Sequence, residues 1–232
     1  MYLNENVSRF SISTSVISAS PVEFFETLTD LVDLGLDRIH VDVMDGHFVP
    51  RLGLYPEMVA NIRKITEIPI DIHLMTSQPE RFLEIFAVAG ASRITPHFES
   101  TLHPHRIIQE IKSLSVEAGI ALNPGTPISA LEELIHEVQA VTLMAINPGI
   151  VGHKFIPTTI QKLERFQKFR DIHGFEGDLE IDGGVVFENI KSLAKYTSVI
   201  LVCGAGTIYN KISSPIANMH NLNKMRTQIT KG

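Results

Sequence analysis

Eight short apolar segments recur along the chain, and this repeat restricts the possible folds more than any other feature of the sequence. The segments begin at Ile12, Arg38, Ile68, Ser92, Ala118, Ala140, Asp178 and Ser198. Amphipathic stretches of helical period lie between them, for example over residues 21–34. Alternating strand and helix signals predict parallel strands joined by helical crossovers. Eight such units in 232 residues fit an α/β fold with a single domain over residues 1–232, a closed (β/α)8 TIM barrel.

The expected helix boundaries carry residues that favour helix ends. Ser20 and Glu23, with Pro21 between them, predict a capping box at the start of the first helix. The other expected openings contain Pro79, Pro104, Pro127, Pro157 and Pro215, and the expected ends contain Gly35, Gly90 and Gly174. An open, doubly wound sheet is the alternative fold, but no GxGxxG turn follows the first strand.

Composition excludes several classes of protein. The net charge of -6 and the absence of a basic patch argue against nucleic acid as a partner. No segment is long enough to span a bilayer, and the first residues lack the apolar stretch of a signal peptide, so we expect a cytoplasmic protein without a membrane partner. Cys203 is the single cysteine, which excludes an internal disulfide. Residues 1–10 and the last few residues are expected to be loosely ordered.

The second apolar segment carries ionisable residues on one face. Period-two alternation puts Ile39 and Val41 on one side of the strand, and His40, Asp42 and Met44 on the other. Ionisable groups on an inward strand face are costly unless they are paired, hydrogen-bonded or bound to a metal. Either this face is not buried, or something binds there.

Two later segments repeat the pattern. Asp71 and His73 share one face of the third segment with Met75, and Glu180 shares one face of the seventh with Asp182. The active site of such a barrel lies at the C-terminal ends of its strands. Four inward side chains can therefore meet near three strand ends: His40, Asp42, His73 and Asp182.

Two imidazoles and two carboxylates suit a borderline divalent ion such as zinc, iron, cobalt or manganese. A single inward His or Asp is more often a buried hydrogen-bonded group, but four at matching positions favour a metal site. Asp42 and Asp182 belong to strands on different sides of the barrel mouth, so they could flank a substrate. One could remove a proton from a carbon while the other returns a proton to the opposite face. A metal between them would stabilise an enediolate.

Other residues near the strand ends permit two interpretations. His97 and Glu99 either support the metal ligands or are solvated. The methionines near the strand ends are ordinary core residues by default, because methionine fills irregular space. The loops after the seventh and eighth segments contain glycine turns, in the position where such barrels bind phosphate. These turns are formed by Gly183 and Gly184, and by Gly204, Ala205 and Gly206.

Several motifs together resemble the ribulose-phosphate 3-epimerase family over nearly the whole chain. They are IHVDVMDGHFVP, DIHLM, ALNPGTP, INPG, KFIP and EIDGG, in the order and spacing of that family. The resemblance implies interconversion of D-ribulose 5-phosphate and D-xylulose 5-phosphate, a reaction of the pentose phosphate pathway. It also implies a small phosphorylated ketose as substrate and a homo-oligomer as the assembly.

The resemblance further implies roles for individual residues. His40, Asp42, His73 and Asp182 would hold one divalent ion, with Zn²⁺ expected first and Fe²⁺, Mn²⁺ or Co²⁺ as alternatives. Asp42 and Asp182 would be the catalytic acid and base. The substrate would be contacted by His73, Asp182, Ser15, Met44, Met75 and Met144, by Gly149, Ile150, Val151 and Gly152, and by Gly183, Gly184, Gly204 and Ala205.

The chain departs from the family pattern around the sugar and the phosphate. The departures are Ser20, Arg51, Tyr55, Ala205 and the loop over residues 147–153, which reads NPGIVGH instead of NPGFGGQ and so contains Val151 and His153. They leave two alternatives open. One is a 3-epimerase of another ketose phosphate, such as allulose 6-phosphate, and the other is a non-catalytic sugar-phosphate-binding relative. The intact pair Asp42 and Asp182 argues against the non-catalytic relative, because a binding protein needs no opposed acids.

Overall fold

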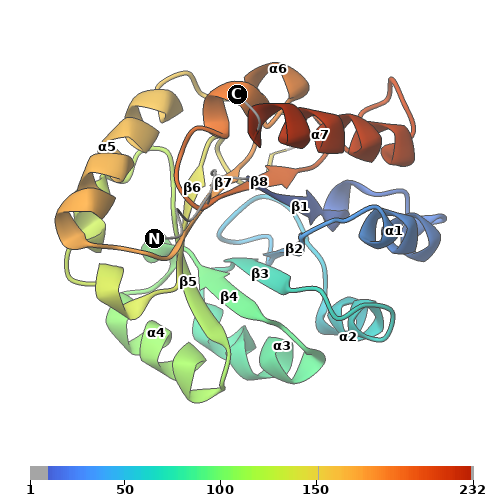
Figure 1. The fold of residues 1–232 in the computed structure, drawn as a ribbon. Helices are drawn as coiled ribbons and strands as arrows, with labels where there is room; N and C mark the ends of the chain where they lie inside the picture. The colour runs from blue at the N-terminus through green and yellow to red at the C-terminus, as the bar shows by residue number, and fades with distance from the viewer. Residues whose placement is uncertain (1–9, 151, 231–232) are drawn as a thin grey trace, which may run out of the picture.

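Each of the eight apolar segments forms one strand in the computed structural model, which describes residues 10–150 and 152–230. The strands are β1 Ser11–Ser15, β2 Arg38–Met44, β3 Ile70–Met75, β4 Arg93–Pro96, β5 Glu117–Leu122, β6 Ala140–Met144, β7 Asp178–Asp182 and β8 Val199–Cys203. Neighbouring strands are parallel, and β8 pairs with β1, so the sheet closes in chain order (Figure 1). The predicted (β/α)8 barrel is confirmed, and its closure excludes the open sheet.

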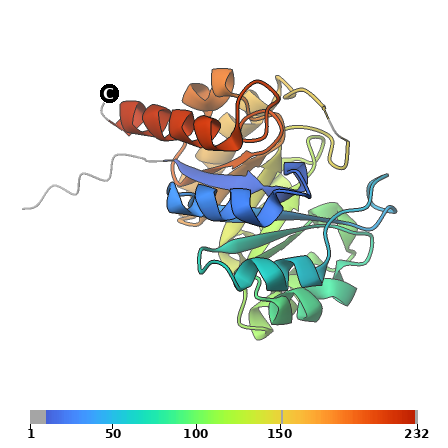
Figure 2. The ribbon, with the colours of Figure 1, turned by 90° about the vertical axis from the view of Figure 1, so that its right-hand side faces the viewer.

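Helices surround the barrel (Figures 1 and 2). The α-helices of the described residues are α1 Phe24–Asp33, α2 Pro56–Arg63, α3 Leu83–Ala89, α4 Pro104–Ser113, α5 Thr159–His173, α6 Phe187–Leu193 and α7 Pro215–Thr230. Short 3-10 helices are η1 Val16–Ser18, η2 Pro79–Phe82, η3 Phe98–Ser100, η4 Ile128–Leu131 and η5 Ile135–Glu137. The connection from β5 to β6 therefore contains η4 and η5 where an α-helix was expected.

The predicted capping box at Ser20 is wrong. Helix α1 begins at Phe24, and its N-cap residue Glu23 makes no capping hydrogen bond through its side chain. Phe24 is 6% exposed whereas Val22 is 94% exposed, so the helix starts where burial starts. Other boundary signals agree with the structure: Pro104 opens α4, Pro215 opens α7, and Gly90 and Gly174 end α3 and α5 with φ of 105° and 60°.

The main hydrophobic core lies between the outer face of the barrel and the helices. The outward residues Ile39 and Val41 of β2 belong to it, together with Leu28 of α1 and Phe166 of α5. Burying such a side chain stabilises a fold by about 1.5–3 kcal/mol. Of the termini expected to be loosely ordered, residues 1–9, 231 and 232 lie outside the described part, and Phe10 is buried in the core.

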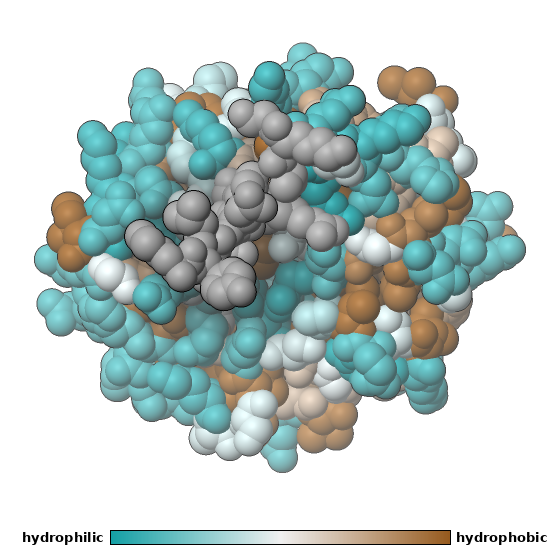
Figure 3. Space-filling view, viewed as in Figure 1, coloured by the Kyte–Doolittle hydropathy of each residue, from teal (hydrophilic) through white to brown (hydrophobic). Residues whose placement is uncertain are grey.

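Two further sequence predictions concern Cys203 and the membrane. Cys203 is buried and unpaired, and burial raises the pKa of its thiol to about 12, as expected of a small core side chain. Within residues 10–150 and 152–230 no helix has the length and apolar character needed to cross a bilayer. On the face shown in Figure 3, hydrophilic residues predominate and apolar residues are interspersed among them.

Candidate metal centre and active site

A cavity of about 620 Å³ opens at the C-terminal ends of the strands. Most strands of the barrel contribute to its wall: the lining includes Ser15 from β1, Asp42 and Met44 from β2, Met75 from β3, Met144 from β6, Asp182 from β7 and Val202 from β8. Parallel strands bring all these ends to one side of the barrel. This is the end at which barrels of this kind place their active sites.

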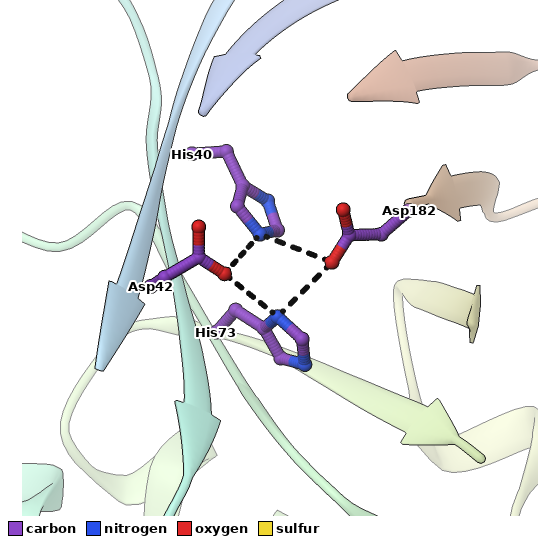
Figure 4. Close-up of side chains that lie close together, drawn as sticks. All are labelled: His40, Asp42, His73 and Asp182. Carbon is purple, nitrogen blue, oxygen red and sulfur yellow. Dashed lines mark hydrogen bonds and ion pairs between the residues drawn. The ribbon is translucent and has the colours of Figure 1, made fainter. Parts of the chain in front are cut away.

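Two histidines and two aspartates meet near the strand ends (Figure 4), and of these four residues the two aspartates line the cavity. One ligand atom from each of His40, Asp42, His73 and Asp182 lies within 4.8 Å of all the others. The Nδ1 atom of His73 is 3.3 Å from Asp42 Oδ1 and 3.3 Å from Asp182 Oδ2. The Nε2 atom of His40 is 3.3 Å and 3.7 Å from the same two oxygens. The two carboxylates thus lie on opposite sides of the imidazoles.

Strand alternation and register explain why these side chains converge. His40 and Asp42 occupy alternate positions of β2, so both point away from the core that covers Ile39 and Val41. The register pairs Asp42 with His73 across β2 and β3, and Met144 with Asp182 across β6 and β7. The four predicted metal ligands are therefore brought together, and none is more than 9% exposed.

The charges of this cluster are strongly coupled. Burial alone would lower the pKa of His40, but Asp42, Glu180 and Asp182 raise it well above its ordinary value. Burial likewise opposes a charge on His73, yet its hydrogen bonds with Asp182 and Asp42 raise its pKa. Burial would raise the pKa of Asp42, and the two imidazoles lower it instead. The carboxylates therefore favour a positive charge at this point.

The residues present fit a divalent metal ion. Both ring nitrogens of His40 are buried and make no hydrogen bond within the described structure, which is costly for a polar group without a partner. Three buried carboxylates, from Asp42, Glu180 and Asp182, surround the two imidazoles. Imidazole nitrogens with carboxylate oxygens are typical ligands of borderline divalent ions.

The structure adds two polar contacts to the predicted metal ligands that the sequence did not indicate, one from Glu180 to His40 and one from Ser15 to Asp42. Glu180 Oε1 lies 3.4 Å from His40 Nδ1 and accepts a hydrogen bond of 3.0 Å from the Thr142 hydroxyl. Burial would raise the pKa of Glu180, but His40 lowers it to about 2. The hydroxyl of Ser15 donates to Asp42 Oδ2 at 2.7 Å. The signal for Glu180 was its inward position, two residues before Asp182.

Two of the three methionines near the strand ends, Met44 and Met75, form part of a small second hydrophobic cluster. Met44 and Met75 pack with Val49, apart from the main core, and Phe48 packs against them. Gly149 lies against this cluster, with φ of 76°, and a Cβ atom there would clash with the Val49 side chain. Loops from β2 and β6 therefore meet beside the cavity, at a position where only glycine fits.

The predicted phosphate loops also line the cavity. Gly183 and Gly184 adopt φ of 99° and 65°, and a Cβ atom on Gly184 would lie 2.6 Å from the backbone nitrogen of Phe155. Gly204 and Ala205 line the same wall. Gly149, Ile150 and Gly152 of the β6 loop belong to the lining as well, whereas Val151 lies outside the described residues.

Comparison with known proteins agrees with this geometry. A sequence model of the Ribulose-phosphate 3 epimerase family matches residues 11–208. The chain belongs to the ribulose-phosphate 3-epimerase family. It is thus an epimerase, an enzyme of the isomerase class.

Curated relatives of this family match most of the chain. The ribulose-phosphate 3-epimerase of Bacillus subtilis is 38% identical over 84% of this chain and 90% of its own length. That of Escherichia coli K12 is 35% identical over 97% of this chain and 98% of its own length. Ribulose-5-phosphate-3-epimerase of Arabidopsis thaliana, named as chloroplastic, is 38% identical over 87% of this chain and 74% of its own length.

Solved structures share the fold at low identity. KGPDC from Streptococcus mutans has a TM-score of 0.66 at 13% identity, over 95% of this chain and 98% of that chain. For 3-hexulose-6-phosphate synthase from Salmonella typhimurium the TM-score is 0.69 at 15% identity, over 95% of this chain and 100% of that chain. At these identities the similarity concerns the barrel alone.

Four departures of this family member from the family pattern line the cavity. They are Arg51, Ile150, His153 and Ala205. Ser20 and Tyr55 are exposed and are not part of the lining that the structure describes. The departures that bear on the substrate are therefore two basic side chains, one aliphatic side chain in place of an aromatic one, and one lost hydroxyl.

The structure decides between the two interpretations of His97. Its ring is buried, and its Nε2 atom lies 2.8 Å from Nε2 of His73. Burial lowers the pKa of His97 to about 4, with the hydrogen bond to Glu99 opposing this shift. A neutral His97 thus contacts the far side of a predicted metal ligand and is not solvated.

Proposed function

We propose that this protein is a metal-dependent ketose-phosphate 3-epimerase that interconverts D-ribulose 5-phosphate and D-xylulose 5-phosphate. The proposal rests on one observation above all. The Asp42 and Asp182 carboxylates, from β2 and β7, approach the same imidazole nitrogen at 3.3 Å from opposite sides. A substrate carbon above this point would have one carboxylate on each face.

The two carboxylates supply the proton transfers. One takes the proton from C3, which gives an enediolate, and the other returns a proton to the opposite face and inverts that centre. The Ser15 hydroxyl bonds to Asp42 Oδ2 and so leaves Oδ1 directed at the histidines. A divalent ion held by His40, Asp42, His73 and Asp182 would stabilise the negative charge that develops on the substrate oxygens.

The remaining lining residues orient the sugar phosphate. Met44, Met75 and Met144 provide apolar walls that exclude water from the enediolate. Backbone N–H groups at the two glycine turns after β7 and β8 would bind the phosphate. Relatives at 35% and 38% identity that carry the ribulose-phosphate 3-epimerase name support this substrate.

A second substrate is favoured by the altered lining. Arg51 and His153 bring basic groups to the cavity, and Ala205 lacks a hydroxyl that could donate to phosphate. The chemistry would be the same on another ketose phosphate, such as allulose 6-phosphate. Zn²⁺ as the ion, a homo-oligomeric assembly, a single domain over residues 1–232 and a cytoplasmic location are further proposals from the sequence.

A solvent-exchange assay tests the function. The purified protein, supplied with Zn²⁺, Fe²⁺, Mn²⁺ or Co²⁺ in turn, is incubated in deuterated water with D-ribulose 5-phosphate or allulose 6-phosphate. We expect deuterium at C3 together with formation of the epimer. Epimerisation of allulose 6-phosphate alone would move the assignment to the second substrate. Absence of exchange and of product with every ion would refute the epimerase proposal.

A further inference from the structure

A chain of polar groups, buried at His73 and His97 and exposed at Glu99, leads away from the metal-binding cluster on the far side of His73. The His73 Nε2 atom lies 2.8 Å from His97 Nε2, and the His97 Nδ1 atom lies 3.2 Å from Glu99 Oε2. The other oxygen, Glu99 Oε1, accepts a hydrogen bond of 2.8 Å from the backbone N–H of Asn123 and a second one from the Thr126 hydroxyl. The chain thus joins the ends of β3, β4 and β5.

The number of protons on the two imidazole rings determines which group donates and which accepts in each hydrogen bond of this polar chain. Two ring nitrogens 2.8 Å apart must share one proton, because two protons would clash and two lone pairs would repel each other. The Nδ1 atom of His73 faces Asp42 and Asp182, and as a metal ligand it must present a lone pair there. The shared proton then belongs to Nε2 of His73. His97 accepts it at Nε2, so a neutral His97 carries its own proton at Nδ1 and donates it to Glu99.

We propose that His97 and Glu99 are positioning residues that hold His73 in the tautomer whose Nδ1 lone pair faces the metal ion. This inference rests on the proposed metal site, and it gives a defined role to two residues that the sequence placed either beside the metal ligands or in solvent. A carboxylate or carbonyl that accepts from the second nitrogen of a ligand histidine fixes its tautomer and ring orientation. Here a second imidazole is placed between the ligand and the carboxylate.

The surroundings of the chain leave its rings in one arrangement. The His97 ring is fully buried, with its centroid 4.9 Å from those of Phe48 and His73. The loop that carries the two donors to Glu99 is held by Lys162, whose Nζ atom donates to the carbonyl oxygens of Asn123 at 2.6 Å and Pro124 at 3.3 Å. The acceptor end of the chain is therefore fixed in place.

The substitution Glu99→Gln would reverse the direction in which the hydrogen bonds of this polar chain donate. The donors of Asn123 and Thr126 require an acceptor at the Oε1 position, so the glutamine oxygen would lie there and its NH2 group would face His97. His97 would then accept at Nδ1 and carry its proton at Nε2. That proton would be donated to His73, whose own proton would move to Nδ1, where it blocks the metal.

Metal affinity and tautomer are the measurements that test this inference. Zinc affinity is measured by competition with a chelator, and nitrogen NMR of the histidine-labelled protein shows which ring nitrogen of His97 carries its proton. For Glu99→Gln we expect zinc to bind about 10- to 100-fold more weakly and the proton of His97 to shift from Nδ1 to Nε2. His97→Phe, which keeps the ring packing but removes the acceptor, should weaken zinc binding to a similar extent. Activity of Glu99→Gln should recover at high zinc concentration, because Glu99 does not line the cavity.

A matched control separates positioning from a loss of structure. Asp71 is a buried carboxylate on β3, the strand that also carries His73, and it pairs with Arg38 instead of with the metal-binding cluster. Asp71→Asn should lower stability and leave zinc affinity within about twofold of the wild type. Unchanged zinc affinity and an unchanged tautomer in Glu99→Gln would overturn the inference, as would equal weakening in Asp71→Asn. If the zinc affinity depends on Glu99 but the protein epimerises no substrate, the proposed function is refuted and this inference stands.

Discussion

The two halves of the barrel interior both contain buried ionisable side chains, but they differ in how these side chains are paired. Near the N-terminal ends of the strands, Arg38 holds Asp71 through two hydrogen bonds of 2.6 and 2.7 Å. Arg93 bonds to Glu117 at 2.9 Å and to Asp178 at 2.6 Å. In this half each guanidinium group bonds directly to at least one carboxylate, so every cation is paired within the chain.

Near the C-terminal ends the pairing is incomplete. Asp42, Glu180 and Asp182 surround two imidazoles, and the described part of this cluster contains no Lys or Arg. The ring nitrogens of His40 have no hydrogen-bond partner within the described structure. Burial of like charges in one place is stable only if a cation compensates them. The comparison indicates that a cluster of directly bonded ion pairs serves the fold, whereas a cluster whose imidazole nitrogens have no hydrogen-bond partner serves a ligand.

The largest expected effect comes from removing a carboxylate of the cluster near the C-terminal ends of the strands. Asp42→Asn and Asp182→Asn should each reduce epimerisation by about 10²- to 10⁴-fold or more, since a general acid or base contributes this much and a metal ligand is lost as well. One of the two variants should still exchange the C3 proton without inversion. Turnover and deuterium incorporation are measured together. If either variant keeps more than about a tenth of the wild-type turnover, the two-carboxylate mechanism is wrong.

Arg38→Met tests the ion pairs near the N-terminal ends of the strands. It leaves the buried carboxyl group of Asp71 without its bidentate partner, so we expect a loss of about 3 kcal/mol in the free energy of unfolding. Denaturant unfolding of the metal-free protein provides the measurement. Zinc affinity and turnover of the folded variant should stay near those of the wild type. A large loss of zinc affinity would show that the two halves are not independent.

The pH dependence of metal binding sharpens the comparison. In the metal-free protein the pKa values of His40 and His73 are raised above the ordinary 6.5. Their contribution to stability is therefore complete below that value and is lost as the pH rises through the raised pKa values. A metal ion must displace these protons, so its affinity should increase with pH over the same range.

Thermal unfolding with and without zinc checks this dependence. As the pH rises above 6.5 through the raised pKa values of His40 and His73, the metal-free protein should lose stability, while the stabilisation by zinc should increase. Calorimetry in buffers of different ionisation enthalpy should show proton release on zinc binding. Full activity in a preparation verified to be free of metal would leave the four residues as a buried polar network.

The smallest expected effect concerns the phosphate loop. Ala205→Ser adds a hydroxyl beside the predicted phosphate position, and a hydrogen bond to a charged group stabilises by about 1.5–3 kcal/mol when it is well shielded. Because Ala205 is exposed, we expect a gain of about tenfold in kcat/KM for D-ribulose 5-phosphate. The double variant with Val151→Gly should gain at least as much. No gain, with a wild-type kcat/KM already near about 10⁷–10⁸ M⁻¹s⁻¹, would mean that these departures are neutral.

The strands and the predicted ligands could be recognised from the sequence because both depend on local alternation. The side-chain period of two along β2 separates Ile39 and Val41 from His40 and Asp42, whatever the rest of the chain does. The same rule places His73 and Asp182 on inward faces. Once parallel strands are arranged in a barrel, such residues near the strand ends can only converge.

Tertiary structure decided two kinds of feature. In one, a local sequence signal competes with packing; in the other, the contact joins residues of different strands. Ser20 offers a cap, but α1 begins at Phe24 because that residue is the first to enter the core. The pairing of His73 with His97, and of His40 with Glu180, depends on the stagger between neighbouring strands, which residue patterns within one strand do not encode. The sequence by itself therefore determined which side chains face the barrel interior, and the closed barrel decided which of them touch.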